Sequence, residues 1–169
     1  MVLTFVEISA LKRAELQSRL LQTLMHAIST SPDFVTAMEH TLANVCETFG
    51  WEYAEAWLPR SEDGMLECCS TFVASPDLEP FRNVRGQLQL PAKMGLPGRV
   101  WSSKEPQWIL DVTKEDELIH HAEVAVDVGL TAGMGVPVVV PASTRLKSAL
   151  GMPILSENSV EVVLTFFMR

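Results

Sequence analysis

The chain is short of cysteine, and this shortage excludes whole classes of small protein. Three cysteines occur among its 169 residues, at Cys46, Cys68 and Cys69. An odd number with no repeated spacing does not form the disulfide framework of a small secreted domain. Neither a Cys-x-x-Cys nor a His-x-x-x-His pattern is present to gather metal ligands. We therefore expect a reducing, cytoplasmic setting and no metal site.

Basic side chains and long apolar runs are scarce as well. Thirteen Lys and Arg stand against 21 Asp and Glu, which gives a net charge of −8 and repels phosphate backbones and anionic membrane surfaces. No apolar run approaches the ~20 residues that cross a bilayer, and no secretion signal is recognisable. The sequence predicts neither nucleic-acid binding nor membrane insertion.

What the chain has is enough apolar material for a core. The hydrophobic fraction is 47% and the charged fraction 20%, as in ordinary globular proteins. A domain of this size buries roughly 70% of the surface of its unfolded chain. The sequence therefore needs neither disulfide nor metal to fold.

The N-terminal segment is expected to hold a short strand over residues 2–8, with Ser9 as the cap of a following helix. Apolar residues then recur at spacings of three and four between residues 10 and 29, as on one stripe of a helix. They are Leu16, Leu20, Leu21, Leu24, Met25 and Ile28. Two uses of this stripe stay open: packing on the same domain, or a homodimer seam of coiled-coil type. We expect residues 1–30 to form this strand and linker helix, and residues 31–169 the main domain.

A second helix is predicted from about residue 33, with Ser31 as its cap, Pro32 at its first position and Gly50 as its stop. Its expected buried face consists of Phe34, Met38, Leu42, Val45, Cys46 and Phe49. On that face Cys46 is expected to be an inert core thiol.

Strands are predicted over residues 52–58 and 65–72, joined by a polar turn at residues 60–64. Residues 75–93 are rich in proline and are expected to be a loop with a short helical piece at 78–84, where a binding lid would lie. A helix is expected over residues 115–128, and a last strand over 160–167.

An internal repetition lies near the end of the chain. Residues 130–139 and 146–155 share a Leu-x-x-x-x-Gly-hydrophobic-Pro pattern at an offset of sixteen. Either both copies are strands of one sheet, or a duplication has moved one copy out of the usual strand position. Pro137 and Pro153 should each lie at a sheet edge or a bulge, because proline donates no ladder hydrogen bond.

The string Gly95-Leu96-Pro97-Gly98-Arg99-Val100-Trp101 resembles the signature of GAF domains, the small sensory modules of signalling proteins. The element Ile109-Leu110-Asp111-Val112 and the Gly-Met-Pro-Ile strand strengthen the resemblance. It implies an α+β fold, with a central antiparallel sheet of about six strands, helices on one face and a pocket formed by loops and short helices on the other. Residues 5–15 also resemble the exit linker of a PAS domain.

These resemblances imply a non-catalytic sensory domain of a larger cytoplasmic signal-transduction protein, such as a two-component system. It would bind a small ligand or dimerise through its N-terminal helix, next to neighbouring signalling domains and without its C-terminal output helix. The candidate ligand-binding residues are Trp101, Trp108, Asp111, His120, His121, Cys68 and Phe72. For each of them a purely structural use, such as core packing or helix capping, stays open. The sequence names no cofactor.

Two alternatives of a different class remain. Cys68 or Cys69 would serve a thiol sensor or redox enzyme, provided that its pKa were lowered. A non-covalent bilin or haem binder is the other alternative. Covalent bilin attachment is disfavoured, because His120 and His121 stand where the bilin-binding relatives carry a Cys-His pair.

Overall fold

The computed structural model describes residues 3–85, 88–112 and 145–169, which form four α-helices, one 3-10 turn and six strands. In chain order they are α1 (Leu3–Thr30), α2 (Phe34–Phe49), β1 (Tyr53–Pro59), β2 (Met65–Val73), η1 (Pro76–Leu78), α3 (Glu79–Arg85), β3 (Gln89–Pro91), α4 (Gly95–Ser103), β4 (Gln107–Ile109), β5 (Ser148–Ser156) and β6 (Ser159–Met168).

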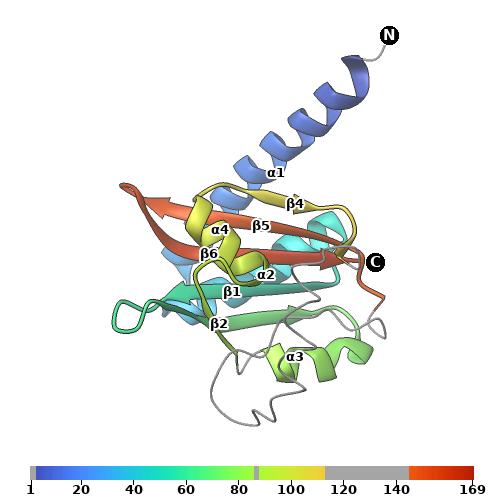
Figure 1. Ribbon diagram of the computed structural model, residues 1–169. Helices are drawn as coiled ribbons and strands as arrows, with labels where there is room; N and C mark the ends of the chain where they lie inside the picture. The colour runs from blue at the N-terminus through green and yellow to red at the C-terminus, as the bar shows by residue number, and fades with distance from the viewer. Residues whose placement is uncertain (1–2, 86–87, 113–144) are drawn as a thin grey trace.

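The six strands form one antiparallel sheet in the order β3-β2-β1-β6-β5-β4 (Figure 1). The first and last strands of the chain, β1 and β6, therefore pair at its centre. The β1–β2 hairpin turns at residues 60–64, where Gly64 has a φ of 67° and Arg60 N donates to Met65 O at 2.8 Å. The α+β class and the antiparallel sheet of six strands are confirmed.

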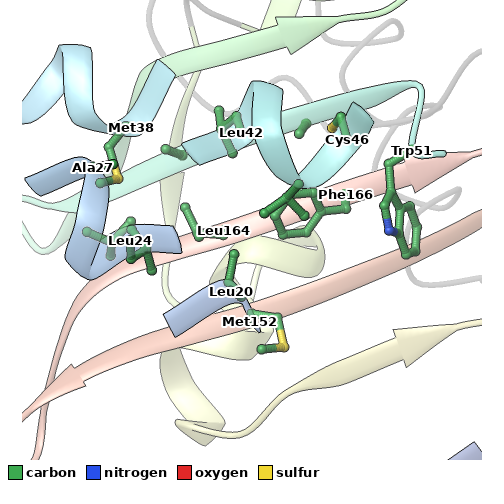
Figure 2. Close-up of a cluster of buried hydrophobic side chains, with 14 of the residues drawn as sticks. Leu20, Leu24, Ala27, Met38, Leu42, Cys46, Trp51, Met152, Leu164 and Phe166 are labelled. Atoms are coloured by element: carbon green, nitrogen blue, oxygen red, sulfur yellow. The ribbon is translucent and has the colours of Figure 1, made fainter. Parts of the chain in front are cut away.

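Each face of the sheet carries its own apolar layer, because successive strand side chains point to opposite faces. From β1, Ala54 and Ala56 face α1 and α2, whereas Tyr53 and Trp57 face α3 and α4. Figure 2 shows the first layer, in which side chains of α1 and α2 meet Leu164 and Phe166 of β6. The second layer contains Leu78, Phe81, Leu90, Leu96 and Val100. Long helices thus cover one face, and short elements cover the other.

The expected strand at residues 2–8, with Ser9 as a cap, is wrong. Helix α1 is continuous from Leu3 to Thr30. This stretch holds no glycine or proline, and once a helix is nucleated each further residue adds one backbone hydrogen bond. The partial alternation at its start was too weak a signal to indicate a strand.

The apolar stripe of α1 divides into two rows. Leu20, Leu24 and Ala27 are buried in the first layer, which confirms that the helix packs on its own domain. Leu21, Met25 and Ile28 are 43%, 73% and 55% exposed. The second half of α1 is therefore part of the core, while its first half extends away from the sheet (Figure 1). The dimer seam stays a prediction.

The N-cap of helix α2 lies two residues later than expected. Asp33, not Ser31, is the N-cap, and its Oδ1 accepts from Thr36 N at 2.9 Å while Oδ2 accepts from Thr36 Oγ1 at 2.8 Å. Asp33 outcompetes Ser31 because its carboxylate accepts both bonds at once. Gly50 ends the helix in the left-handed conformation, as predicted. The expected buried face is confirmed at Met38, Leu42, Val45 and Cys46, Phe49 is partly buried, and Phe34 is 40% exposed.

The second copy of the repetition forms β5. Pro153 lies opposite Val163 of β6 and beyond the end of β4, which pairs with residues 149–151. It thus has a strand on one side only within the described part of the chain, as predicted for a proline. The first copy, Pro137 and the helix expected over residues 115–128 lie outside the described residues.

Candidate functional site

The glycine-rich string 95–101 forms helix α4 and holds it close to the sheet. A Cβ added at Gly98 would lie 2.5 Å from Pro91 O, and Gly98 O accepts from Lys93 N at 2.9 Å. On the other side of α4, a Cβ at Gly151 of β5 would lie 2.5 Å from Val100 Cγ2. The two glycines therefore permit a close approach of α4 to the turn after β3 and to β5.

The sheet separates the predicted ligand-binding residues into two sets. Trp101 and Cys68 pack against the layer under α3 and α4. Trp108 and Phe72 pack against the layer under α1 and α2, where Trp108 meets the edge of Trp51 at a centroid distance of 5.7 Å. A single ligand cannot contact both sets, since the sheet lies between them.

Three predicted residues remain: Asp111, His120 and His121. Asp111 is half-buried just after β4. His120 and His121 lie outside the described residues. A ligand contact of any predicted residue stays a prediction.

A buried polar cluster on the α3–α4 face was not predicted from the sequence. Glu55, at the middle of β1, accepts from Arg85 of α3 through both carboxylate oxygens, Oε1 from Nε and Oε2 from Nη2. Its Oε2 also accepts from Trp57 Nε1 and from Thr165 Oγ1, each at 2.9 Å. Glu55 is 0% exposed and Arg85 1%. We call these residues, together with Tyr53, the Glu55 cluster.

Strand geometry and one short helix assemble this cluster. Tyr53, Glu55 and Trp57 share a face because they alternate along β1, and Thr165 lies directly opposite Glu55 on β6. Arg85 is the last residue of α3. Its guanidinium carbon lies 5.5 Å from the Trp57 ring centre, 5.4 Å from that of Phe81 and 5.6 Å from that of Phe167. Aromatic rings thus enclose a cation, an attractive arrangement in a dry site.

Burial acts on the ionisable groups of the cluster in opposite ways. Burial alone would lower the pKa of Arg85, but the Glu55 carboxylate outweighs it and holds that pKa above its ordinary value. The pKa of Tyr53 is raised, first by burial and then by Glu55. Arg85 is therefore cationic and Tyr53 a neutral phenol at physiological pH.

Two donors of the cluster are unused. Within the described part of the chain, Arg85 Nη1 and Tyr53 Oη are buried and have no hydrogen-bond partner. An unpaired buried donor costs about 1–3 kcal/mol, and more on a charged group. Such groups are rare in folded proteins and call for an explanation.

The thiols of all three cysteines are protonated at physiological pH. The pKa of Cys68 is raised, first by burial and then by the charge of Glu55. Burial raises the pKa of Cys69 to about 11 and that of Cys46 to about 12. Cys46 is buried in the core, as expected. Because the thiolate is the nucleophile, these shifts count against a redox or thiol-attachment chemistry.

A second, more open feature is a hollow of about 450 Å³ at the outer edge of β2. Its lining combines residues 68–71 of that strand with Glu39 of α2 and with Arg82 and Asn83 of α3. No group of His, Cys, Asp and Glu within the described residues is arranged to hold a metal ion. The described helices also include none with the length and apolarity of a membrane span.

Comparison with known proteins identifies the fold. No family model and no curated protein matches the sequence. Among solved structures, the GAF domain of a phosphoenolpyruvate-protein phosphotransferase from Coxiella burnetii superposes with a TM-score of 0.62 at 16% identity, over 92% of this chain and 79% of that one. The GAF domain of the Acinetobacter phosphotransferase gives 0.62 at 15% identity, over 89% and 76%.

A third similar structure is an enzyme. The free methionine-R-sulfoxide reductase of Neisseria meningitidis, in complex with its substrate, gives a TM-score of 0.58 at 18% identity, over 92% of this chain and 74% of that one. The chain therefore has the GAF fold, as the resemblance implied. Since that fold occurs in an enzyme as well as in the GAF domains of larger proteins, it does not by itself decide the function.

The thiol pKa values predict slow alkylation of the native protein. At pH 8 a thiol with a pKa of about 11 is roughly one part in a thousand thiolate, against about a quarter for an ordinary cysteine. Cys68 and Cys69 should therefore react with iodoacetamide more than ~100-fold more slowly in native protein than in urea, as measured by peptide mass spectrometry. The native rate at Cys69 should keep rising with pH up to about 11. Rates within ~10-fold of the unfolded ones would restore the thiol-sensor alternative.

Proposed function

We propose that this chain is a non-catalytic sensory domain that binds a small molecule on the α3–α4 face of its sheet. The observation that carries the proposal is the Glu55 cluster, with its two unused buried donors at Arg85 and Tyr53. Replacing a buried ion pair by apolar residues of similar volume is often neutral or stabilising. The two unused donors play no part in holding α3 on the sheet, so we propose that they serve a ligand.

The protein context of the domain is part of the same proposal. The GAF domains of the phosphotransferases belong to larger proteins, and the similar reductase was solved with its substrate bound. We place this domain in a larger cytoplasmic signalling protein, next to a PAS domain and in a two-component system. Of the ligand-binding residues predicted from the sequence, Trp101 and Cys68 share the face of the Glu55 cluster and belong to the proposed site.

Two tryptophans on opposite faces provide a matched test of where the ligand binds. A library of small molecules is screened for compounds that raise the melting temperature of the wild-type domain. At 100 times its Kd a ligand adds about 2.7 kcal/mol, which is a shift of several degrees. Trp101→Leu should weaken the binding of a compound so found, and Trp108→Leu should leave its Kd unchanged, as measured by calorimetry.

Two results would contradict the proposal. One is a library without any stabilising compound. The other is a compound whose Kd rises as much in Trp108→Leu as in Trp101→Leu, since Trp108 packs beneath the sheet against Trp51.

We further propose that the domain forms a homodimer through α1. Leu21, Met25 and Ile28 follow one another at spacings of four and three and form an exposed apolar row. Phe34 and Val35 at the start of α2 are also exposed, at 40% and 42%. A second copy of the same row would bury these side chains and release their water.

The dimer is tested by placing a charge in this row. Met25→Glu should convert a wild-type dimer into a monomer in light scattering and keep its helix content, because the wild-type side chain is 73% exposed. His26→Glu, at an exposed polar position about 100° round the helix from Met25 and outside the apolar row, is the matched control and should remain dimeric. A monomeric wild-type protein at high concentration, or a dimeric Met25→Glu, would contradict the proposal.

A further inference from the structure

We infer that the molecule bound at this site is uncharged and presents a carbonyl-type oxygen to Arg85 Nη1 and Tyr53 Oη. The inference rests on the proposed function and specifies the chemistry of the ligand. It follows from three properties of the Glu55 cluster: which hydrogen-bonding groups are already used, where the unused ones lie, and how the charges balance.

Glu55 is already held by donors of its own cluster. Its two oxygens take four hydrogen bonds, from Arg85 Nε, Arg85 Nη2, Trp57 Nε1 and Thr165 Oγ1. A carboxylate oxygen offers about two such positions, so Oε2 with three donors is full, while Oε1 takes its one bond from Arg85 Nε. Glu55 therefore orients Arg85. Arg85 Nη1 can only donate, so the ligand group that meets it must supply an acceptor.

The two unused donors belong to side chains that pack against the same two rings. The Tyr53 ring centre lies 4.9 Å from that of Phe81 and 5.8 Å from that of Phe167. The guanidinium carbon of Arg85 lies over the same two rings, at 5.4 and 5.6 Å. Because Nε and Nη2 are turned toward Glu55, Nη1 is left on the other end of the guanidinium. In the inferred complex, one oxygen atom of the ligand accepts from both Nη1 and Oη.

Charge balance decides between a carboxylate and a neutral oxygen. Within the described residues, Glu55 and Arg85 are the charged side chains among the buried ones, and they neutralise each other. An anionic ligand would bring a second negative charge beside Glu55, whose countercharge Arg85 is already paired with it. An uncompensated charge in such a layer is far costlier than a neutral polar group with its hydrogen bonds made. An amide, lactam or ketone oxygen meets this condition.

A matched pair of probes separates the two chemistries. Acetamide and acetate have nearly the same shape and differ in charge. Each is titrated into the 15N-labelled domain at constant ionic strength, and the N–H signals of the Trp57 indole and of Arg85 Nε are followed by NMR. Both groups donate to Glu55 and report any change beside it. Acetamide should shift both signals saturably, and acetate should not.

Tyr53→Phe and Ser70→Ala form the matched variants. Tyr53→Phe removes an unpaired oxygen and keeps the ring, so the fold should persist and acetamide should bind at least about fivefold more weakly, since a hydrogen bond contributes ~1 kcal/mol. Ser70 also has an unpaired buried hydroxyl, but its cross-strand neighbour Ala56 belongs to the opposite layer. Ser70→Ala should therefore leave acetamide binding unchanged.

Each contrary outcome identifies what has failed. The inference is overturned if acetate binds as tightly as acetamide, or if Tyr53→Phe does not weaken the binding of acetamide. Either result would still agree with the proposed function, the binding of a small molecule. The inference also fails if neither probe shifts the two signals and Tyr53→Phe does not weaken the binding of the compound found in the thermal screen. In that case the two donors do not bind the ligand. The absence of any stabilising compound in that screen defeats the proposed function itself.

Discussion

The buried ion pair between Glu55 and Arg85 is the interaction on which the α3–α4 face depends. It joins the middle of the central strand β1 to the last residue of α3, thirty residues later. Two charges in a dry layer are tolerated only together, because removing either one leaves an uncompensated charge at a cost of about 3–5 kcal/mol. The pair therefore fixes α3 on the sheet, and the rings of Trp57, Phe81 and Phe167 pack around it.

The same strand connects the two faces of the molecule. Along β1, the residues of the Glu55 cluster alternate with Ala54 and Ala56, which pack under α1 and α2. Since β1 contacts α2 and α2 contacts α1, we propose that a ligand that displaced Glu55 would shift these neighbours and, through α2, the packing of α1. Coupling of this kind between two sites is typically worth ~1–3 kcal/mol. The proposed ligand site and the proposed dimer helix are thus linked by packing rather than by direct contact.

The features that the sequence predicted well are those set by local chemistry. Helix α2 with its glycine stop and the β1–β2 hairpin each depend on residues close together in the chain. The α1 start was misjudged because residues 2–8 alternate only in part. The assignment of Trp108 to the first layer depends on its pairing with Leu150, forty-two residues later, which no local pattern encodes.

The Glu55 cluster was missed for the same reason. A glutamate between Ala54 and Ala56 in an otherwise apolar strand was a visible signal of a buried charge that needs a partner. Nothing in the chain indicated which of its basic residues would be that partner, since Arg82 and Arg85 belong to the same short helix. Tertiary packing selects Arg85, while Arg82 remains exposed and bonds Thr71 and Glu79.

The most direct test of this account is a double-mutant cycle on the Glu55–Arg85 pair, with unfolding free energies from denaturant titration. Glu55→Gln and Arg85→Met should each cost about 3–5 kcal/mol, and the double variant should cost less than their sum by about 2–3 kcal/mol. The same cycle on the exposed Glu79–Arg82 pair is the control and should give a coupling below about 1 kcal/mol. A coupling at Glu55–Arg85 no larger than that of the exposed pair would contradict the central role assigned to it.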